Sequence, residues 1–310
     1  MGNNQIALRR HEEVNTELRT GKSSEWLASH FCLWYTCDIM AEETGWRIEE
    51  RRGLRYYCLN HPAIRARGGA LIQGVFTRQG GVSREPWGSL NVGHTVGDDT
   101  RAVEVNHHRI CQALDIPREA ITTAHQVHGA RVGRVGAEDQ GTTLSSTDGL
   151  ITDVPDVALM LRFADCVPLL FFDPHRPAVG LAHAGWRGTL AGIARKVVRA
   201  MAIAFNSQPE ELIAGIGPSI GPCCYQIGWD LADRVQAQFP QWPDLIHWRC
   251  SDRPYLDLWR ANQRQLEEAG VRSIALAQRC TACRVDEFFS HRAEGGRTGR
   301  FAVVIGLRGA

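Results

Sequence analysis

A cysteine and a histidine bracket two apolar segments in the middle of the chain. Cys166 precedes the run Pro168–Phe172, and His183 follows the run 178–182, 183 − 166 = 17 residues later. Each run has the length of a strand, and the two prolines between them predict a turn. Neighbouring strands joined by a short turn bring Cys166 and His183 to the same edge of a sheet. Because thiolate and imidazole bind zinc and copper well, the pair is a candidate metal or nucleophile site.

A third member of this site comes from an earlier segment. Residues 121–129 form a short apolar and β-branched run that ends in His125, His128 and a glycine. Residues i and i+3 of a strand point to opposite faces, so at most one of the two histidines faces a shared site. His128 is the better candidate, because sites concentrate in loops at strand ends. Asp165, directly before Cys166, is a candidate to orient a ligand or carry a proton, or else only caps a turn.

Composition excludes several classes of protein. The chain has 310 residues, 44% of them hydrophobic, which is typical of a globular protein with a large core. Its 35 basic and 34 acidic residues give a formal net charge of +1, so nothing favours nucleic acid or a membrane as partner. No run approaches the ~20 apolar residues of a membrane span. Ten cysteines without a signal peptide predict reduced thiols and a cytoplasmic protein.

Strands and helices are expected to alternate along residues 69–310, whereas residues 1–68 carry few strong signals and are interpreted as an N-terminal extension. Cys32 and Cys37 of that extension are interpreted as a small packing pair. The pattern predicts an α/β or α+β fold built on a mixed sheet. The clearest expected strands are 54–59, 70–76, 157–163, 212–216, 271–276 and 301–305, and the clearest expected helices are 100–116, 190–205, 230–239 and 258–269.

Four cysteines of the C-terminal half are not expected to share a metal. Cys280 and Cys283 form a C-x2-C pair, but no second pair follows at the spacing of a zinc ribbon. Cys223 and Cys224 are adjacent in the chain, so their side chains are expected to point in different directions and to pack against neighbours. A structural metal at the C-x2-C pair is the less favoured interpretation.

Three further segments carry candidate ligand-binding groups. The loop 89–99 packs polar groups between glycines, where Asn91 and His94 offer hydrogen bonds, although a solvated turn explains it equally well. Arg187, at the start of an expected helix, is a candidate to hold an anion such as phosphate. The basic loop 295–300 either faces solvent or closes over an anionic substrate group.

These motifs together closely resemble the laccase-domain family, known as multicopper polyphenol oxidases and more recently as purine nucleoside phosphorylases with adenosine deaminase activity. The match runs from about residue 70 to the C-terminus, roughly three quarters of the chain. The matching segments are FTRQGGVS (76–83), SLNVGHTVGDD (89–99), HQVHG (125–129), TDGLIT (147–152), ADCVPLLFFDP (164–174), AHAGWRGT (182–189), GIGPSIGPCCYQIG (215–228) and FFSHRAEGGRTGR (288–300).

The resemblance implies a fold and a cofactor. It implies a single α+β domain of mixed sheets flanked by helices, the laccase-domain or cysteine-hydrolase-like fold. It also implies a His-Cys-His centre, usually with zinc and alternatively with copper, at His128, Cys166 and His183. Three protein ligands leave a fourth position for water, whose pKa zinc lowers to about 7.

The implied activity is phosphorolysis of adenosine, inosine or methylthioadenosine, together with deamination of adenosine. Purine nucleosides and phosphate are then the small-molecule partners. Arg78, Arg187 and Arg292 are candidate partners of phosphate, and Asn91 and His94 are candidate partners of the base or ribose.

Three other functions compete with this interpretation. In the first, Cys166 is a nucleophile with His183 or His128 as base, and the enzyme hydrolyses an amide of a cell-wall (peptidoglycan) precursor. The second is copper-dependent phenol oxidation, which needs many histidines in paired motifs, and the 12 histidines do not fall into such pairs. The third is a binding module with a closed four-ligand zinc site, which requires His125 or His94 to turn inward.

Overall fold

The computed structural model describes residues 45–248 and 253–309, so the expected features of Trp26–Tyr35 and the Cys32–Cys37 pair lie outside the described residues. The helices are α2 (Pro62–Arg65), α3 (Thr100–Leu114), α4 (Trp186–Leu190), α5 (Ile193–Phe205), α6 (Trp229–Gln238) and α7 (Leu258–Glu268), with 3-10 turns at Arg118–Ala120, Ala137–Asp139, Pro209–Glu211 and Pro243–Leu245. The strands are β1 (Trp46–Arg51), β2 (Leu54–Leu59), β3 (Leu71–Phe76), β4 (Ile121–Ala124), β5 (Val132–Arg134), β6 (Thr143–Leu144), β7 (Gly149–Thr152), β8 (Ala158–Phe163), β9 (Val167–Asp173), β10 (Ala178–Ala184), β11 (Ile213–Ile216), β12 (Ile246–Trp248), β13 (Pro254–Leu256), β14 (Ser273–Leu276) and β15 (Phe301–Leu307).

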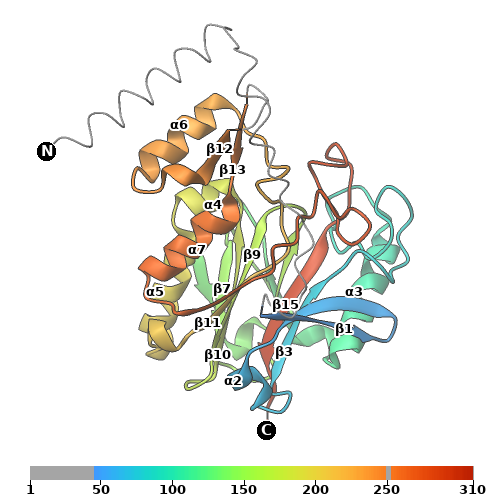
Figure 1. Ribbon diagram of the computed structural model, residues 1–310. Coiled ribbons are helices and arrows are strands. Elements are labelled where there is room, and N and C mark those ends of the chain that lie inside the picture. The colour runs from blue at the N-terminus through green and yellow to red at the C-terminus, as the bar shows by residue number, and fades with distance from the viewer. Residues whose placement is uncertain (1–44, 249–252, 310) are drawn as a thin grey trace, which may run out of the picture. The chain divides into compact units, whose positions relative to one another are not determined.

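Two mixed sheets carry most of these strands. The seven-stranded sheet has the order β1-β2-β3-β15-β8-β4-β6, and the six-stranded sheet has the order β14-β11-β9-β10-β7-β5. The helices α5 and α7 lie together on one side of the six-stranded sheet, whereas α3 lies beside β2 and β3 of the other sheet (Figure 1). The predicted α+β architecture of mixed sheets flanked by helices is confirmed.

Three buried clusters fill the spaces between these layers. Leu169 and Phe171 of β9 pack in the cluster beneath α5, whereas Leu170 and Phe172 pack in the cluster between the two sheets. A third cluster, which contains Ile110 of α3, lies on the outer side of the seven-stranded sheet. Because both faces of β9 and β10 are buried, these strands appear in the sequence as continuous apolar runs instead of alternating ones.

The predicted pairing of the two central runs is confirmed. β9 and β10 are antiparallel neighbours, and their register places His183 opposite Pro168 and Ala184 opposite Val167. Cys166, directly before β9, therefore lies at the same edge of the sheet as His183.

The chain crosses from the seven-stranded to the six-stranded sheet three times, at the same end of the two sheets. β4, β6 and β8 are parallel to one another, and each is followed along the chain by β5, β7 or β9 of the other sheet. The three crossing segments are 125–131, 145–148 and 164–166. Parallel strands end at the same edge, so the three crossings lie together. The predicted site residues His128, Asp165 and Cys166 belong to these crossings.

Most expected elements have observed counterparts, with two differences. The helix expected at 190–205 is divided at Gly192, whose φ of +76° separates α4 from α5. The hairpin of β1 and β2 lies before the predicted domain start at residue 69 and extends the seven-stranded sheet through the pairing of β2 with β3. A separate extension therefore stays a prediction only for residues before β1. Among the described residues, no helix is long and apolar enough to cross a membrane.

Candidate metal centre

Three side chains meet where the chain crosses between the sheets. One ligand atom from each of His128, Cys166 and His183 lies within 4.8 Å of the others. The two imidazole rings are nearly perpendicular, with 4.8 Å between their centroids and 76° between their planes. His183 is buried against Phe163, the last residue of β8, whereas His128 is exposed. The group is thus buried on one side and accessible on the other.

The His128 loop has a conformation that no strand could supply. β4 ends at Ala124, so His125 and His128 both lie beyond the strand, and only His128 joins the other two ligands. His128 has a φ of +59°, in the left-handed region that costs a non-glycine residue free energy. The surrounding hydrogen bonds must therefore hold this loop in place.

Asp148 provides those hydrogen bonds, and the sequence analysis did not select it. Its fully buried carboxylate accepts hydrogen bonds from the amides of Val127, His128 and Gly129 at 3.2, 3.0 and 2.8 Å. It also accepts one from Nδ1 of His183 at 2.9 Å, which leaves Nε2 of that ring to face a metal. One carboxylate therefore positions two of the three candidate ligands.

Gly185 leaves room for the group. A Cβ at this position would lie 3.0 Å from Sγ of Cys166 and 3.3 Å from Cδ2 of His128. Its φ of −69° is accessible to any residue, so the close approach of the two ligands, and not backbone conformation, explains the glycine.

The protonation states of Cys166, His183 and Asp148 allow Cys166 to act as a metal ligand or as a nucleophile. Burial acts to raise the pKa of Cys166, but the charge of His183 and hydrogen bonds with His128 and His183 lower it to about 6. Burial acts to lower the pKa of His183, but the Cys166 thiolate and Asp148 raise it to about 9. Burial opposes ionisation of Asp148, yet the hydrogen bonds from His183 and the loop amides hold its pKa below the usual value. Cys166 is consequently a thiolate near neutral pH.

The donor set fits a zinc ion. Two imidazoles and a thiolate are borderline and soft ligands, and a catalytic zinc site has three protein ligands and one open position. The hydrogen bond from His183 to Asp148 is the carboxylate-histidine arrangement typical of metal sites. The same residues also fit copper, whose ligands overlap with those of zinc.

Asp165 lies beside the trio but turns its carboxylate toward two other loops. Oδ1 accepts hydrogen bonds from the hydroxyls of Thr281 and Ser290, both at 2.7 Å, and Oδ2 accepts one from the amide of Arg292 at 2.7 Å. Its main-chain oxygen accepts a hydrogen bond from the amide of Ile220 at 2.9 Å. Asp165 thus fastens the neighbouring loops to the crossing that carries Cys166, and its proton-carrying role stays a prediction.

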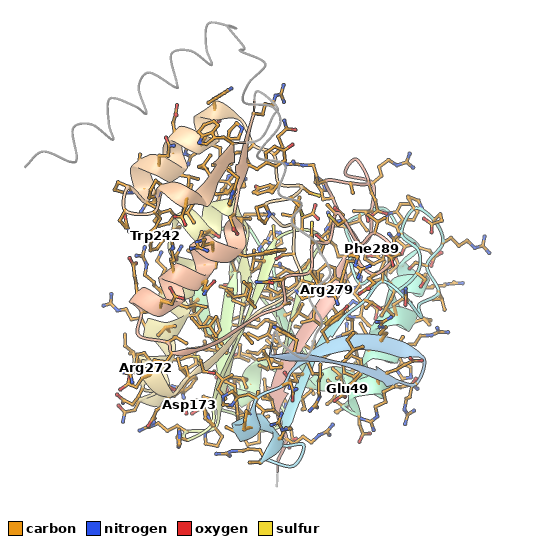
Figure 2. The ribbon with its side chains drawn as sticks, viewed as in Figure 1. Glu49, Asp173, Trp242, Arg272, Arg279 and Phe289 are labelled. Carbon is orange, nitrogen blue, oxygen red and sulfur yellow. The ribbon has the colours of Figure 1, made fainter. Side chains whose placement is uncertain are left out.

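Two predicted substrate contacts have their polar atoms engaged inside the protein. Asn91 is fully buried, and its side chain bonds to Asp98 and to the amides of Gly93 and Arg300. Arg78 bonds to the main chain and to Glu294 and lies 4.5 Å over the ring of Phe289, which is labelled in Figure 2. His94 is exposed, 3.6 Å from Glu104 and stacked on His107.

Two other predicted contacts, Arg187 and Arg292, lie near Tyr225, and the guanidinium of Arg292 lies 5.2 Å over its ring. Both have exposed side chains, and their charges and those of Cys166 and Asp165 act on the phenol of Tyr225. Burial and the two anionic groups raise the pKa of Tyr225, and the two arginines act to lower it. The guanidinium of Arg292 also bonds to the main-chain oxygens of Cys224 and Gln226, at 3.3 and 2.8 Å.

Arg300 is a further cation of this region that the sequence analysis missed. Burial lowers its pKa, and the opposing effects of Cys166 and Asp165 show that its guanidinium lies near both. The FFSHRAEGGRTGR motif contained the signal, but its three arginines gave no basis for choosing this one.

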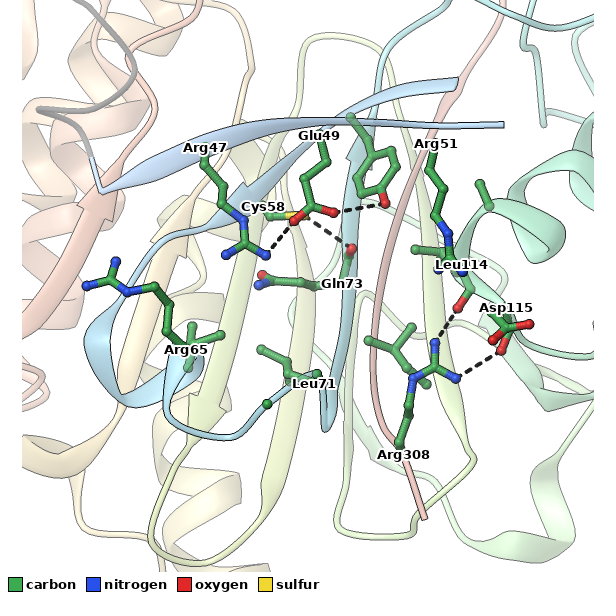
Figure 3. Close-up of a pocket in the computed structure, with 16 residues that line it drawn as sticks. Arg47, Glu49, Arg51, Cys58, Arg65, Leu71, Gln73, Leu114, Asp115 and Arg308 are labelled. Carbon is green, nitrogen blue, oxygen red and sulfur yellow. Dashed lines mark hydrogen bonds and ion pairs between the residues drawn. The ribbon is translucent and has the colours of Figure 1, made fainter. Parts of the chain in front are cut away.

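A cavity of about 680 Å³ lies elsewhere in the domain (Figure 3). Its walls carry charges of both signs: Arg47 contacts Glu49, and Arg308 bonds to main-chain oxygens of Leu114 and Asp115. None of the trio, nor Asp148, lines it. The candidate chemistry is therefore that of the crossing loops.

Known proteins of one family match most of the chain. The family model described as multi-copper polyphenol oxidoreductase laccase matches residues 72–308. A purine nucleoside phosphorylase, YlmD of Geobacillus stearothermophilus, is 42% identical over 247 residues, which are 76% of this chain and 90% of that protein. YlmD of Bacillus subtilis, with the same description, is 38% identical over 250 residues, 77% of this chain and 90% of that protein.

Solved structures give the same result. The crystal structure of YlmD from Geobacillus stearothermophilus has a TM-score of 0.77 and 38% identity, and the match covers 84% of this chain and 98% of that one. A Bacillus licheniformis protein described as hypothetical protein YfiH has a TM-score of 0.76 and 33% identity, with 85% and 99% covered. The resemblance inferred from the motifs is confirmed.

Proposed function

Because this chain belongs to the family described as multi-copper polyphenol oxidoreductase laccases, and relatives 38–42% identical to it are named purine nucleoside phosphorylases, we propose that it is a zinc-dependent purine nucleoside phosphorylase. Adenosine, inosine and methylthioadenosine are the proposed substrates, and adenosine deamination is the proposed second reaction. The observation that carries the proposal is the trio with one accessible ligand, whose cysteine interacts electrostatically with Arg300 and with Tyr225, the neighbour of Arg187 and Arg292.

In phosphorolysis, a phosphate oxygen bonds to C1′ of the ribose as the bond from C1′ to the purine nitrogen breaks, and the purine leaves with the electron pair and gains a proton. The phosphate carries about two negative charges at neutral pH, so it requires cations beside C1′. Arg187 and Arg292 are exposed, and their charges act on Tyr225 together with those of Cys166 and Asp165, which supports this role. Half-buried Arg300 adds a further positive charge whose pKa is affected by Cys166 and Asp165.

The trio, held by Asp148, is the proposed zinc site, and zinc bound there supplies Lewis-acid chemistry. Deamination consumes one water and releases ammonia, so it does not require phosphate. Phosphorolysis does require it.

Product analysis tests the proposal directly. Adenosine and inosine are incubated with the purified protein, with and without phosphate, and the products are separated by chromatography. We expect adenine or hypoxanthine only with phosphate, and inosine from adenosine under both conditions. Absence of every one of these products would sink the proposal. Metal analysis of the same preparation distinguishes zinc from copper.

A second function, amide hydrolysis with Cys166 as nucleophile, is favoured by one observation. The thiolate lies beside His183, and His183 bonds to Asp148 at 2.9 Å, which is the order of groups in a Cys-His-Asp triad. The substrate would then be an amide such as that of a peptidoglycan precursor.

Metal removal separates the two functions. A zinc enzyme loses nucleoside turnover after treatment with a chelator and regains it with added zinc. A cysteine nucleophile keeps its activity in the chelator and loses it after alkylation. Nucleoside turnover that survives complete metal removal but not alkylation contradicts the zinc mechanism.

A further inference from the structure

A second group of metal-ligand side chains lies outside the trio. The structure brings together Cys223, Cys224, Cys280 and Cys283, whose sulfur atoms all lie within 4.8 Å of one another. Sγ of Cys283 is 3.5 Å from Sγ of Cys223 and 3.4 Å from Sγ of Cys224. The sequence-based expectation that the adjacent cysteines point in different directions is therefore wrong. The turn after Gly221 brings both side chains to the same C-x2-C pair.

The distances match those of a tetrathiolate site. Zinc-sulfur bonds of about 2.3 Å in a tetrahedron place the sulfur atoms about 3.8 Å apart. The sulfur-sulfur distances of 3.4 and 3.5 Å are slightly shorter than this value, and no two of the four sulfur atoms are more than 4.8 Å apart. Small shifts of the side chains thus suffice for coordination.

The backbone around the four cysteines is already fixed. Ser219 and Cys280 form a parallel β-bridge, and the amides of Ser219 and Thr281 bond across it at 3.1 Å each. Arg279, labelled in Figure 2, precedes Cys280 and supplies one of the oxygens of the bridge. The amide of Gly221 donates to Sγ of Cys280 at 3.3 Å, which is the kind of hydrogen bond that supports a thiolate ligand.

Hydrophobic packing accounts for Cys280, Cys223 and Cys224, which belong to or pack against a core cluster, but not for Cys283. Cys280 is buried, Cys223 and Cys224 are half-buried, and Cys283 is exposed. An exposed thiol gains little from contact with other thiols, whereas a metal needs an approach from solvent to reach its ligands. The charge of four thiolates around a divalent ion is partly offset by Arg292, whose guanidinium bonds to the main-chain oxygen of Cys224 at 3.3 Å.

We propose that Cys223, Cys224, Cys280 and Cys283 bind a second zinc ion as a closed, structural tetrathiolate site. Four sulfur ligands favour zinc among the common divalent ions and leave no open position for chemistry. Each thiol gives up a proton when the ion binds.

This ion would link two loops that wall the trio. One loop carries Ile220 and Tyr225, and the other carries Thr281, Ser290 and Arg292; four of these five residues bond to Asp165. The nearest ligands of the two loops are 280 − 224 = 56 residues apart in the chain. Cross-linking segments so distant in sequence limits their independent motion. The site therefore supports the wall of the active centre without taking part in the reaction.

Metal content of variants tests the proposal. The full-length protein is purified under reducing conditions and analysed for zinc by mass spectrometry. We expect about two zinc ions per chain, and about one in Cys166→Ala, because that change leaves the four-cysteine site intact. Cys283→Ser alters an exposed position and should also retain about one. Cys58→Ser and Cys111→Ser, buried cysteines outside both groups, serve as controls and should retain two.

Two further measurements keep the test independent of folding defects and of catalysis. Cobalt-substituted Cys166→Ala should show the thiolate-to-cobalt charge-transfer band of a multi-thiolate site. Hydrogen exchange of residues 217–228 and 277–292 should become faster in Cys283→Ser. Cys166→Ala that binds no zinc when the reduced protein is incubated with the ion and keeps four freely reactive thiols, disulfides among the four, or iron in place of zinc would each overturn the proposal.

Discussion

Replacing Asp148 by Asn tests how the trio is positioned. The change conserves shape but leaves one oxygen and one NH2 group where the carboxylate had two acceptors. Oδ1 accepts from His128 and His183, and Oδ2 accepts from Val127 and Gly129. In either orientation the NH2 group faces two donors, so two of the four hydrogen bonds are lost.

The size of the effect follows from these contacts. A hydrogen bond to a charged group contributes about 1.5–3 kcal/mol, so two such losses set an upper limit of about 3–6 kcal/mol. Because relaxation and water recover part of this, we expect the metal-free variant to lose about 2–4 kcal/mol of unfolding free energy. Loss of the group that orients a ligating histidine should weaken zinc binding at the trio about 10–100-fold.

Denaturant unfolding of chelator-treated protein measures the first quantity, and competition with a chromophoric chelator measures the second. Asp153→Asn is the matched control, at the other end of β7, where the carboxylate is partly exposed and pairs with Arg134 at 3.3 Å. This control should change stability by less than about 0.5 kcal/mol and leave zinc affinity unchanged. If Asp148→Asn binds zinc as tightly as the parent protein, the assigned positioning role is wrong.

Three more outcomes are expected from the same geometry. In chelator-treated protein, the rate of Cys166 alkylation, followed by peptide mass spectrometry, should fall to half its maximum near pH 6, because the thiol of lowered pKa is a thiolate above that pH and a neutral thiol below it. Cys58, whose pKa is raised by burial, is the control and should stay unmodified. A midpoint at the ordinary thiol pKa of about 8.5 would contradict the pairing of Cys166 with His183. Gly185→Ala should lower zinc affinity and Gly185→Ser should lower it further, because the added Cβ lies 3.0 Å from the Cys166 sulfur; unchanged binding in both would show that the neighbours yield freely. Arg187→Gln and Arg292→Gln should each raise the KM for phosphate about tenfold or more and leave the rate of phosphate-independent deamination within a factor of about two. Arg195→Gln, which removes an exposed ion pair with Glu268, is the control and should change neither quantity. Equal loss of phosphorolysis and deamination would indicate a defect of the loop and not of phosphate binding.

The stability of the fold is expected to depend on pH through Cys166 and His183. Cys166 has a pKa lowered to about 6 and His183 one raised to about 9 in the metal-free protein. The depressed thiol pKa gives stability that is lost as pH falls through 6, and the raised imidazole pKa gives stability that is lost as pH rises through 9. The charged pair therefore persists between these two values.

Apolar patterning predicted the centre of the fold, because burial on both faces leaves a direct trace in the sequence. The runs before and after the 173–177 turn are β9 and β10, and the pairing that the sequence predicts for them places Cys166 beside His183. His128 was selected correctly as a neighbour of the pair, although it lies beyond the strand and not at its last position.

What sequence patterning missed depends on contacts between distant segments. Asp148 looks like an ordinary turn residue before Gly149, and its role appears only when β4 and β6 deliver their loops to the same edge. Asn91 shows the reverse case. A polar residue among glycines is typical both of a ligand-binding loop and of a loop held by its own hydrogen bonds, and here its atoms serve the second purpose.

The three parallel crossings between the sheets also have a mechanical consequence. Two members of the trio lie on different crossings and the third lies at the end of β10, so an ion bound to all three ties both sheets together at one end. Cys166 and His183 share one edge of the six-stranded sheet, whereas His128 follows β4 of the seven-stranded sheet. Movement of one sheet against the other would therefore shift His128 relative to the other two ligands, and an ion bound to all three would resist that movement.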